Sequence, residues 1–114
     1  MSKEEKKRKK KVAKTIEKQY RELYQKNKER HSSRFGGLGT IKCDVDEKTL
    51  EIKETKEGEK KVKFQIECTE KAPLMTGDTL LETEEECILE EEGEDVSVKD
   101  CKRITGHNPI GYRP

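Results

Sequence analysis

The chain has 114 residues, the size of one small domain or of a small domain with an extension. Charged residues make up 45% of it and hydrophobic residues only 28%, whereas an average globular domain is roughly 45–50% apolar. The composition therefore predicts one modest hydrophobic core and argues against a multidomain enzyme, a membrane-spanning helix and a large buried cofactor site. Aromatic residues are 4% of the chain and Trp is absent, which argues against a base-stacking platform.

The net charge of +1 is the balance of two oppositely charged parts. Residues 1–34 hold ten Lys and four Arg against five Glu, a net charge of +9. The remaining residues carry −8, and residues 78–95 contain ten carboxylates and no basic side chain. Local charge should therefore decide what the protein binds. A basic segment of this kind suits nucleic acid, an acidic protein, an anionic membrane or the acidic part of a second copy.

The first 31 residues are predicted to form one helix, because they contain no Pro or Gly and are rich in Lys, Glu, Arg and Gln. Residues 2–11 carry no apolar side chain, so no tertiary contact is expected to hold them. The helix is expected to end near residues 31–33, and we interpret residues 1–34 as a basic arm and the Gly-rich residues 35–39 as a hinge. One apolar stripe, spaced 4, 4 and 3 residues apart, comprises Val12, Ile16, Tyr20 and Leu23.

Alternating polar and apolar residues predict a small acidic β domain over residues 40–106. Turns are expected at residues 46–48, 56–59 and 91–94. The alternation breaks at Leu80–Leu81, at Ile88–Leu89 and at Cys101, which indicates a β-bulge or strands buried on both faces. The expected strands lie at residues 41–45, 50–52, 62–68, 79–83, 86–91 and 96–103.

The predicted fold class is α+β, with the long basic N-terminal helix followed by a small antiparallel β-barrel or bent sheet. Five to six strands are expected, in a domain of SH3-like or OB-like size. An open sheet covered by the apolar stripe of the helix is the alternative. The layout, with a Gly77-Asp78 turn entering paired strands, is similar to that of several small phage assembly proteins.

Two further segments are expected to be irregular. Residues 72–78 contain Pro73 and Gly77 and are predicted to form a loop. Residues 107–114 hold two Pro and one Gly and are predicted to form an irregular C-terminal tail. Its apolar residues Ile110 and Tyr112 are expected to pack on their own domain or to bind a neighbouring protein.

The four Cys residues, at positions 43, 68, 87 and 101, are expected to be buried free thiols. The basic start is not followed by an apolar stretch, so no secretory signal is predicted. We therefore expect a reducing cytoplasm, or a virion or host cytoplasm if the protein is viral. The separations of 25, 19 and 14 residues lack the close pairs of zinc motifs. A disulfide is the other alternative, and a contact between Cys43 and Cys68 is compatible with the strand pattern.

Residues 6–11 are six consecutive basic residues and form the strongest local signal. Phosphate binding requires several cations along one element, so that condensed counterions are released together. A nuclear-import signal, a membrane-surface helix, an acidic protein partner and a solubilising tail are the alternatives. The candidate nucleic-acid-binding residues are Lys3, Lys6, Lys7, Arg8, Lys9, Lys10, Lys11, Lys14 and Lys18.

The carboxylates of residues 84–86 and 90–92 lack the alternating spacing of a calcium loop, and no metal or cofactor is expected. Neither His31 nor His107 belongs to a motif with a nucleophile, so no enzymatic activity is expected. The acidic residues are predicted to form a solvated strand face or a partner-binding patch comprising Glu84, Glu85, Glu86, Glu90, Glu91 and Glu92.

The function predicted from these patterns is non-enzymatic binding, in which the basic helix contacts nucleic acid and the β domain contacts protein. The alternative is a structural or assembly subunit, for example a phage virion or connector protein. In that alternative the basic arm of one copy contacts the acidic patch of the next.

Overall fold

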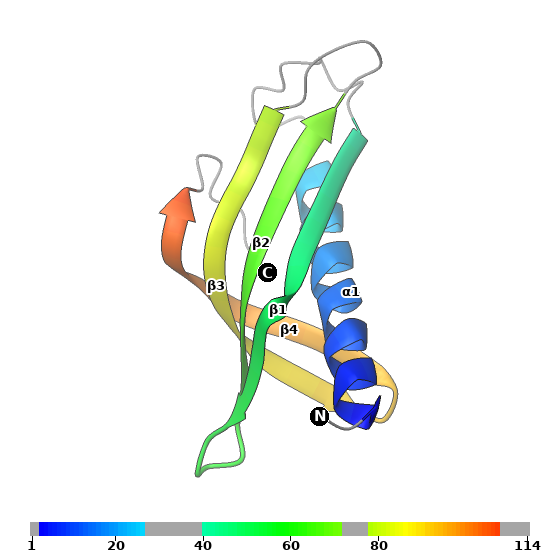
Figure 1. The fold of residues 1–114 in the computed structure, drawn as a ribbon, viewed down its shortest axis with the longest axis vertical. Coiled ribbons are helices and arrows are strands. Elements are labelled where there is room, and N and C mark those ends of the chain that lie inside the picture. The colour runs from blue at the N-terminus through cyan, green and yellow to red at the C-terminus, as the bar shows by residue number, and fades with distance from the viewer. Residues whose placement is uncertain (1–2, 27–39, 72–77, 108–114) are drawn as a thin grey trace.

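The computed structural model describes residues 3–26, 40–71 and 78–107. They form one helix and one antiparallel sheet with strand order β1-β2-β3-β4. Figure 1 shows that the sheet is strongly bent, so that the end of β3 and the start of β4 sweep behind β1 and β2 toward α1. The elements are α1 (Lys3–Lys26), β1 (Thr40–Glu54), β2 (Lys60–Lys71), β3 (Asp78–Glu92) and β4 (Asp95–His107).

A helix followed by an antiparallel sheet is the coarse architecture that the sequence predicts. The described residues nevertheless contain four strands rather than five or six, and they form an open sheet rather than a barrel. The strand count differs because the expected runs 41–45 and 50–52 are one strand, as are the runs 79–83 and 86–91. Within the described residues, the sheet is bent, as one form of the prediction has it, and it is open and covered by the helix, as the alternative has it.

The turn expected at residues 46–48 is a bulge within β1. The pairing with β2 passes from Asp46–Gln65 to Glu51–Lys63, so β1 carries extra residues here without reversing direction. The Asp46 side chain accepts a hydrogen bond from the backbone amide of Lys48 at 3.0 Å, and the backbone amide of Gln65 donates to the Thr49 hydroxyl at 3.2 Å. Local side-chain hydrogen bonds thus satisfy backbone amides at this polar segment, whose sequence resembles that of a turn.

Bulges also explain two of the breaks in alternation. The pairing of β2 with β3 passes from Cys68–Leu81 to Thr69–Thr79, which leaves Leu80 as an extra residue. Between β3 and β4, Cys87 lies opposite both Asp100 and Cys101, and Asp100 has a φ of 49°. The expected turns before β2 and before β4 are confirmed, and Gly58 and Gly93 have positive φ there.

One hydrophobic core joins α1 to all four strands. Val12, Ile16 and Tyr20 of the predicted stripe are buried, whereas Leu23 is half-buried and Tyr24 takes the inner position. The Tyr20 ring packs edge-to-face on Phe64, with ring centroids 6.1 Å apart. From Val12 to Tyr24, the predicted arm therefore packs on the β domain.

Two polar side chains of α1 bond to the two edge strands. Gln19 accepts a hydrogen bond from the Val98 amide of β4 at 2.8 Å and donates to the Val98 carbonyl at 3.1 Å. On the other edge, the Val45 amide of β1 donates to the Glu17 carboxylate at 3.3 Å. Burial raises the pKa of Glu17, and this hydrogen bond partly offsets the rise. Side chains of the helix thus hydrogen-bond backbone groups of the two edge strands, which pairing between β1 and β4 would satisfy in a closed barrel.

All four cysteines form disulfides, Cys43–Cys68 and Cys87–Cys101. The prediction of free thiols is therefore wrong, whereas the prediction of burial is confirmed because none is more than 8% exposed. Cys43 and Cys68 are direct register partners, with Cα atoms 4.0 Å apart. Each disulfide joins an edge strand to a central strand. Which cysteines pair depends on the register of the strands, which the separations of the cysteines in the sequence do not define.

Several predicted features lie outside the described residues: the helix end at residues 31–33, the hinge at 35–39, the loop before β3, and Ile110 and Tyr112. His107 ends β4 and is the register partner of Glu82. Within the described ranges, no helix has the length and apolar character needed to cross a bilayer.

Candidate functional site

The side of α1 that is turned toward solvent and toward the edge strand β1 carries a continuous row of basic side chains. Its members recur at three- or four-residue intervals, which places them on one face of the helix, and all of them are exposed. From the first member to the last, the row is about 27 Å long at 1.5 Å per residue. We call this row the basic ridge: Lys3, Lys7, Lys10, Lys11, Lys14, Lys18 and Arg21.

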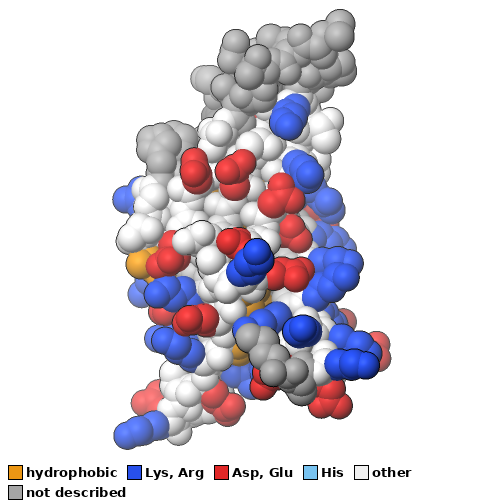
Figure 2. Space-filling view, viewed as in Figure 1, with side chains coloured by type: hydrophobic (Ala, Val, Ile, Leu, Met, Phe, Trp, Pro, Cys, Tyr) orange, Lys and Arg blue, Asp and Glu red, His pale blue; other side chains and the backbone are white. Residues whose placement is uncertain are grey.

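The basic ridge is held in place by the core on the other side of the helix. Val12, Ile16 and Tyr20 have no exposed surface, so rotation of α1 about its axis would uncover them. Figure 2 shows basic side chains along the edge of the molecule where α1 lies, and acidic side chains over the strands. Glu4 and Glu22 lie near the two ends of the ridge.

Three of the predicted nucleic-acid-binding residues lie off the ridge. Arg8 turns toward the sheet and bonds to Glu91, so the expectation that residues 2–11 make no tertiary contact is wrong at this position. Lys9 is half-buried and lines a hollow with Glu51 and Lys53 of β1. Lys6 is exposed but falls outside the ridge by its helical position; it lines a hollow next to the β1 bulge together with the ridge members Lys7 and Lys10. The six-residue basic run therefore does not present a single surface.

Arg8, Lys60 and Glu91 form a small ionic cluster between α1 and the sheet. Glu91 Oε1 lies 2.5 Å from Arg8 Nη2 and 3.3 Å from Lys60 Nζ. The hydrogen bond from Arg8 is the main cause that lowers the pKa of Glu91, and the same bond raises the pKa of Arg8. Part of the charge separation seen in the sequence is thus neutralised within the chain.

The predicted acidic patch is divided by the alternation of β3. Glu85 has no exposed surface and lies beneath α1, where the Tyr20 hydroxyl is 3.4 Å from its carboxylate. Its assignment to a partner-binding surface is therefore wrong in this fold. Glu91 also points to the α1 side, as the Arg8 contact requires. A contiguous run of Glu residues in a strand places alternate members on opposite faces.

The other members of the patch are separated along the outer face and the turn. Glu84 lies 3.6 Å from Lys63, and Glu90 lies 2.6 Å from Lys99. Lys99 donates a hydrogen bond to the Glu90 carboxylate, and this bond raises the pKa of Lys99. Glu86 is half-buried, and Glu92 is exposed where β3 ends. These residues do not form one compact patch.

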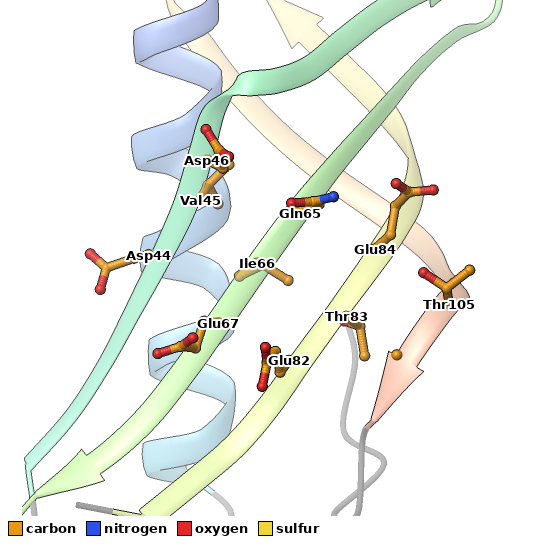
Figure 3. Close-up of a pocket in the computed structure, with 11 residues that line it drawn as sticks. Asp44, Val45, Asp46, Gln65, Ile66, Glu67, Glu82, Thr83, Glu84 and Thr105 are labelled. Carbon is orange, nitrogen blue, oxygen red and sulfur yellow. The ribbon is translucent and has the colours of Figure 1, made fainter.

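A different acidic surface, which the sequence reasoning missed, lies on the face of the sheet opposite α1. Figure 3 shows it on the strands in front of the helix, around a hollow lined from all four strands. Its members alternate with buried residues of the same strands, so they project away from the core. We call it the acidic sheet face: Asp44, Asp46, Glu67, Glu82 and Glu84.

Three of these carboxylates form one row across neighbouring strands. Asp44 is the register partner of Glu67, and Glu67 is the register partner of Glu82. Like charges directly opposite each other destabilise a sheet. In the described part of the chain, no basic side chain lies within ion-pair distance of Glu67 or Glu82, while Lys42 lies 3.9 Å from Asp44. The described residues hold no cluster of His, Cys, Asp and Glu suited to a metal ion.

Alternation within each strand could have identified the polar faces. The row itself depends on which strands are neighbours and in which register, which is not local information. Comparisons with protein-family models, with curated proteins and with solved structures found no match to the chain.

Proposed function

We propose that the protein is a non-enzymatic nucleic-acid-binding protein whose basic ridge contacts phosphates. The observation that supports the proposal most directly is the row of exposed Lys and Arg side chains along one fixed face of α1. A line of cations on one rigid element can neutralise several phosphates together, and the release of their counterions favours binding.

The chemistry of the ridge favours binding without sequence preference. Six of its seven members are Lys, which binds phosphate as a point charge rather than as a planar bidentate donor. Phosphate contacts position a protein on nucleic acid but do not read the bases. Affinity should therefore depend strongly on salt and weakly on sequence.

The acidic sheet face supports an orientation for the complex. Its members other than Asp44 lie on the other side of the sheet from α1, so bound phosphates would meet the ridge and remain distant from them. Asp44, on the edge strand β1, lines a hollow with the ridge residues Lys14, Lys18 and Arg21. The β domain would then be free to contact protein.

The test is a salt titration of binding to duplex and single-stranded oligonucleotides. The triple variant Lys7→Gln, Lys11→Gln and Lys14→Gln removes three ridge charges. It should flatten the slope of log K against log salt by about 2.7 on duplex DNA and about 2.1 on single strands. No detectable binding of the unaltered chain at low salt would refute the proposal.

A matched control removes the same charge from exposed Lys residues outside the ridge. The variant Lys53→Gln, Lys56→Gln and Lys102→Gln should change the slope by less than about one unit, because these side chains lie on the sheet and its first turn. Equal losses in the two triple variants would mean that net charge, and not the ridge, determines binding.

A further inference from the structure

We propose that the acidic sheet face is the docking surface for the basic ridge of a second copy of this chain, so that copies associate head to tail. This inference goes beyond nucleic-acid binding and does not depend on it, because the contact involves protein alone. Three features of the described residues carry it: matching dimensions, opposite charge and placement on opposite sides of the sheet.

The dimensions of the two surfaces match. The row of Asp44, Glu67 and Glu82 spans three adjacent strands, which is about 10 Å at roughly 4.8 Å per strand. Along the ridge, Lys7 and Lys14 are two helical turns apart, about 10.5 Å. A helix that crosses the strands can therefore place one Lys over each carboxylate of the row.

Charge complementarity selects the ridge as the occupant. Glu67 and Glu82 face each other across β2 and β3 without an ion pair among the described residues. Bringing cations over them would relieve their mutual repulsion. The ridge of a second copy supplies those cations on a helix face that is already exposed and ordered by the core behind it.

The placement of the two surfaces determines the kind of assembly. The ridge lies on the α1 side of the sheet, whereas Glu67 and Glu82 of the acidic face lie on the other side, with Asp44 at the edge next to the ridge. Two copies therefore cannot exchange the contacts of Glu67 and Glu82 reciprocally. The contact is heterologous, and it produces a ring or an open chain rather than a closed dimer. Ion pairs at exposed positions are weak and are screened by salt, so association should require low ionic strength.

The test is sedimentation velocity of the full chain, free of nucleic acid, over a range of protein and salt concentrations. At about 0.02 M salt, where screening is weak, the weight-average mass should exceed the 13.3 kDa of one chain and rise with protein concentration. It should return to the single-chain value at about 1 M salt. A single-chain mass at every salt concentration would overturn the inference.

Reciprocal charge reversal identifies the surfaces. The variant Glu67→Lys and Glu82→Lys, and the variant Lys11→Glu and Lys14→Glu, should each remain single chains at low salt. Mixed in equal amounts, they should associate again, because the reversed positions of one variant then meet the reversed positions of the other, and the unaltered ridge meets the unaltered face. Failure of the mixture to associate, with both variants folded by circular dichroism, would overturn the assignment of the surfaces.

A matched control reverses two exposed charges in the turns, Glu57→Lys and Glu94→Lys. It has the same net charge as the Glu67/Glu82 variant and should still associate; loss of association here would attribute the effect to net charge and overturn the inference. A single-chain protein that bound a lysine-rich peptide would also overturn it and indicate another cationic partner. The Glu67/Glu82 variant keeps the ridge, so its oligonucleotide binding tests the proposed function separately.

Discussion

Reduction of the two disulfides is expected to remove a large part of the stability of the fold. Cys43–Cys68 closes a sequence separation of 25, and Cys87–Cys101 closes one of 14. The loop-entropy relation gives about 3.5 kcal/mol for the first and about 3.0 kcal/mol for the second. The two loops do not overlap in the sequence, so both contributions add to about 6.5 kcal/mol as an upper value.

This loss is comparable with the whole stability of a small domain, which is about 5–15 kcal/mol. Thermal unfolding followed by circular dichroism, with and without a phosphine reductant, should therefore show a midpoint lower by more than about 10 °C after reduction. The variants Cys43→Ala with Cys68→Ala, and Cys87→Ala with Cys101→Ala, separate the two bonds. Each pair releases one edge strand from its central neighbour.

The control is the variant with all four cysteines replaced by Ala, whose midpoint should not respond to the reductant. The reasoning is refuted if the unreduced protein carries four alkylatable thiols by intact mass. It is refuted equally if full reduction leaves the midpoint unchanged.

Three further changes test the packing of the helix on the sheet. Phe64→Ala should lower the free energy of unfolding by roughly 3–5 kcal/mol in a urea titration, because the ring is fully buried; a loss below about 1 kcal/mol would contradict the assigned inner face. Gln19→Ala should lower it by about 1–3 kcal/mol, since both backbone groups of Val98 lose their partner. Arg8→Ala should lower it by only about 0.2–1 kcal/mol near pH 7, because Arg8 is 43% exposed. Because the pKa of Glu91 is lowered, its ion pair with Arg8 stabilises the fold above pH 4.5, the ordinary pKa of the group, and this contribution is lost as pH falls through the lowered pKa. The Arg8→Ala loss should therefore shrink as pH is lowered below 4.5, and a loss that does not change with pH would contradict this sign.

Local periodicity was sufficient to predict most of the buried face of the helix, although Tyr24 rather than Leu23 takes the last inner position. Val12, Ile16 and Tyr20 follow the helical repeat and are buried, and the strand alternation predicts inner positions such as Phe64. The strand count was not predictable in the same way, because residues 46–48 have the composition of a turn but form a bulge. Composition alone does not distinguish a turn from a bulge, because the difference depends on whether the chain goes on pairing with the same neighbouring strand after the polar segment.

The remaining differences come from contacts between residues distant in the sequence. The pairing of Cys43 with Cys68 and the row from Asp44 to Glu82 both depend on strand register. The burial of Glu85 follows from strand alternation. The prediction of one acidic patch treated the run of Glu residues as lying on a single face and so missed this burial. The basic ridge follows from helical geometry, but the contact of Arg8 with Glu91 joins residues that are 83 positions apart in the sequence.

The basic ridge as a phosphate-binding surface is tested most directly by mass-spectrometric footprinting of Lys acetylation on the full chain, at low salt, with and without an oligonucleotide. We expect the nucleic acid to protect Lys7, Lys11 and Lys14 of the ridge, while Lys53 and Lys102 on the sheet react equally in both samples. Protection confined to the sheet, or no protection at an oligonucleotide concentration that saturates binding, would contradict the proposal.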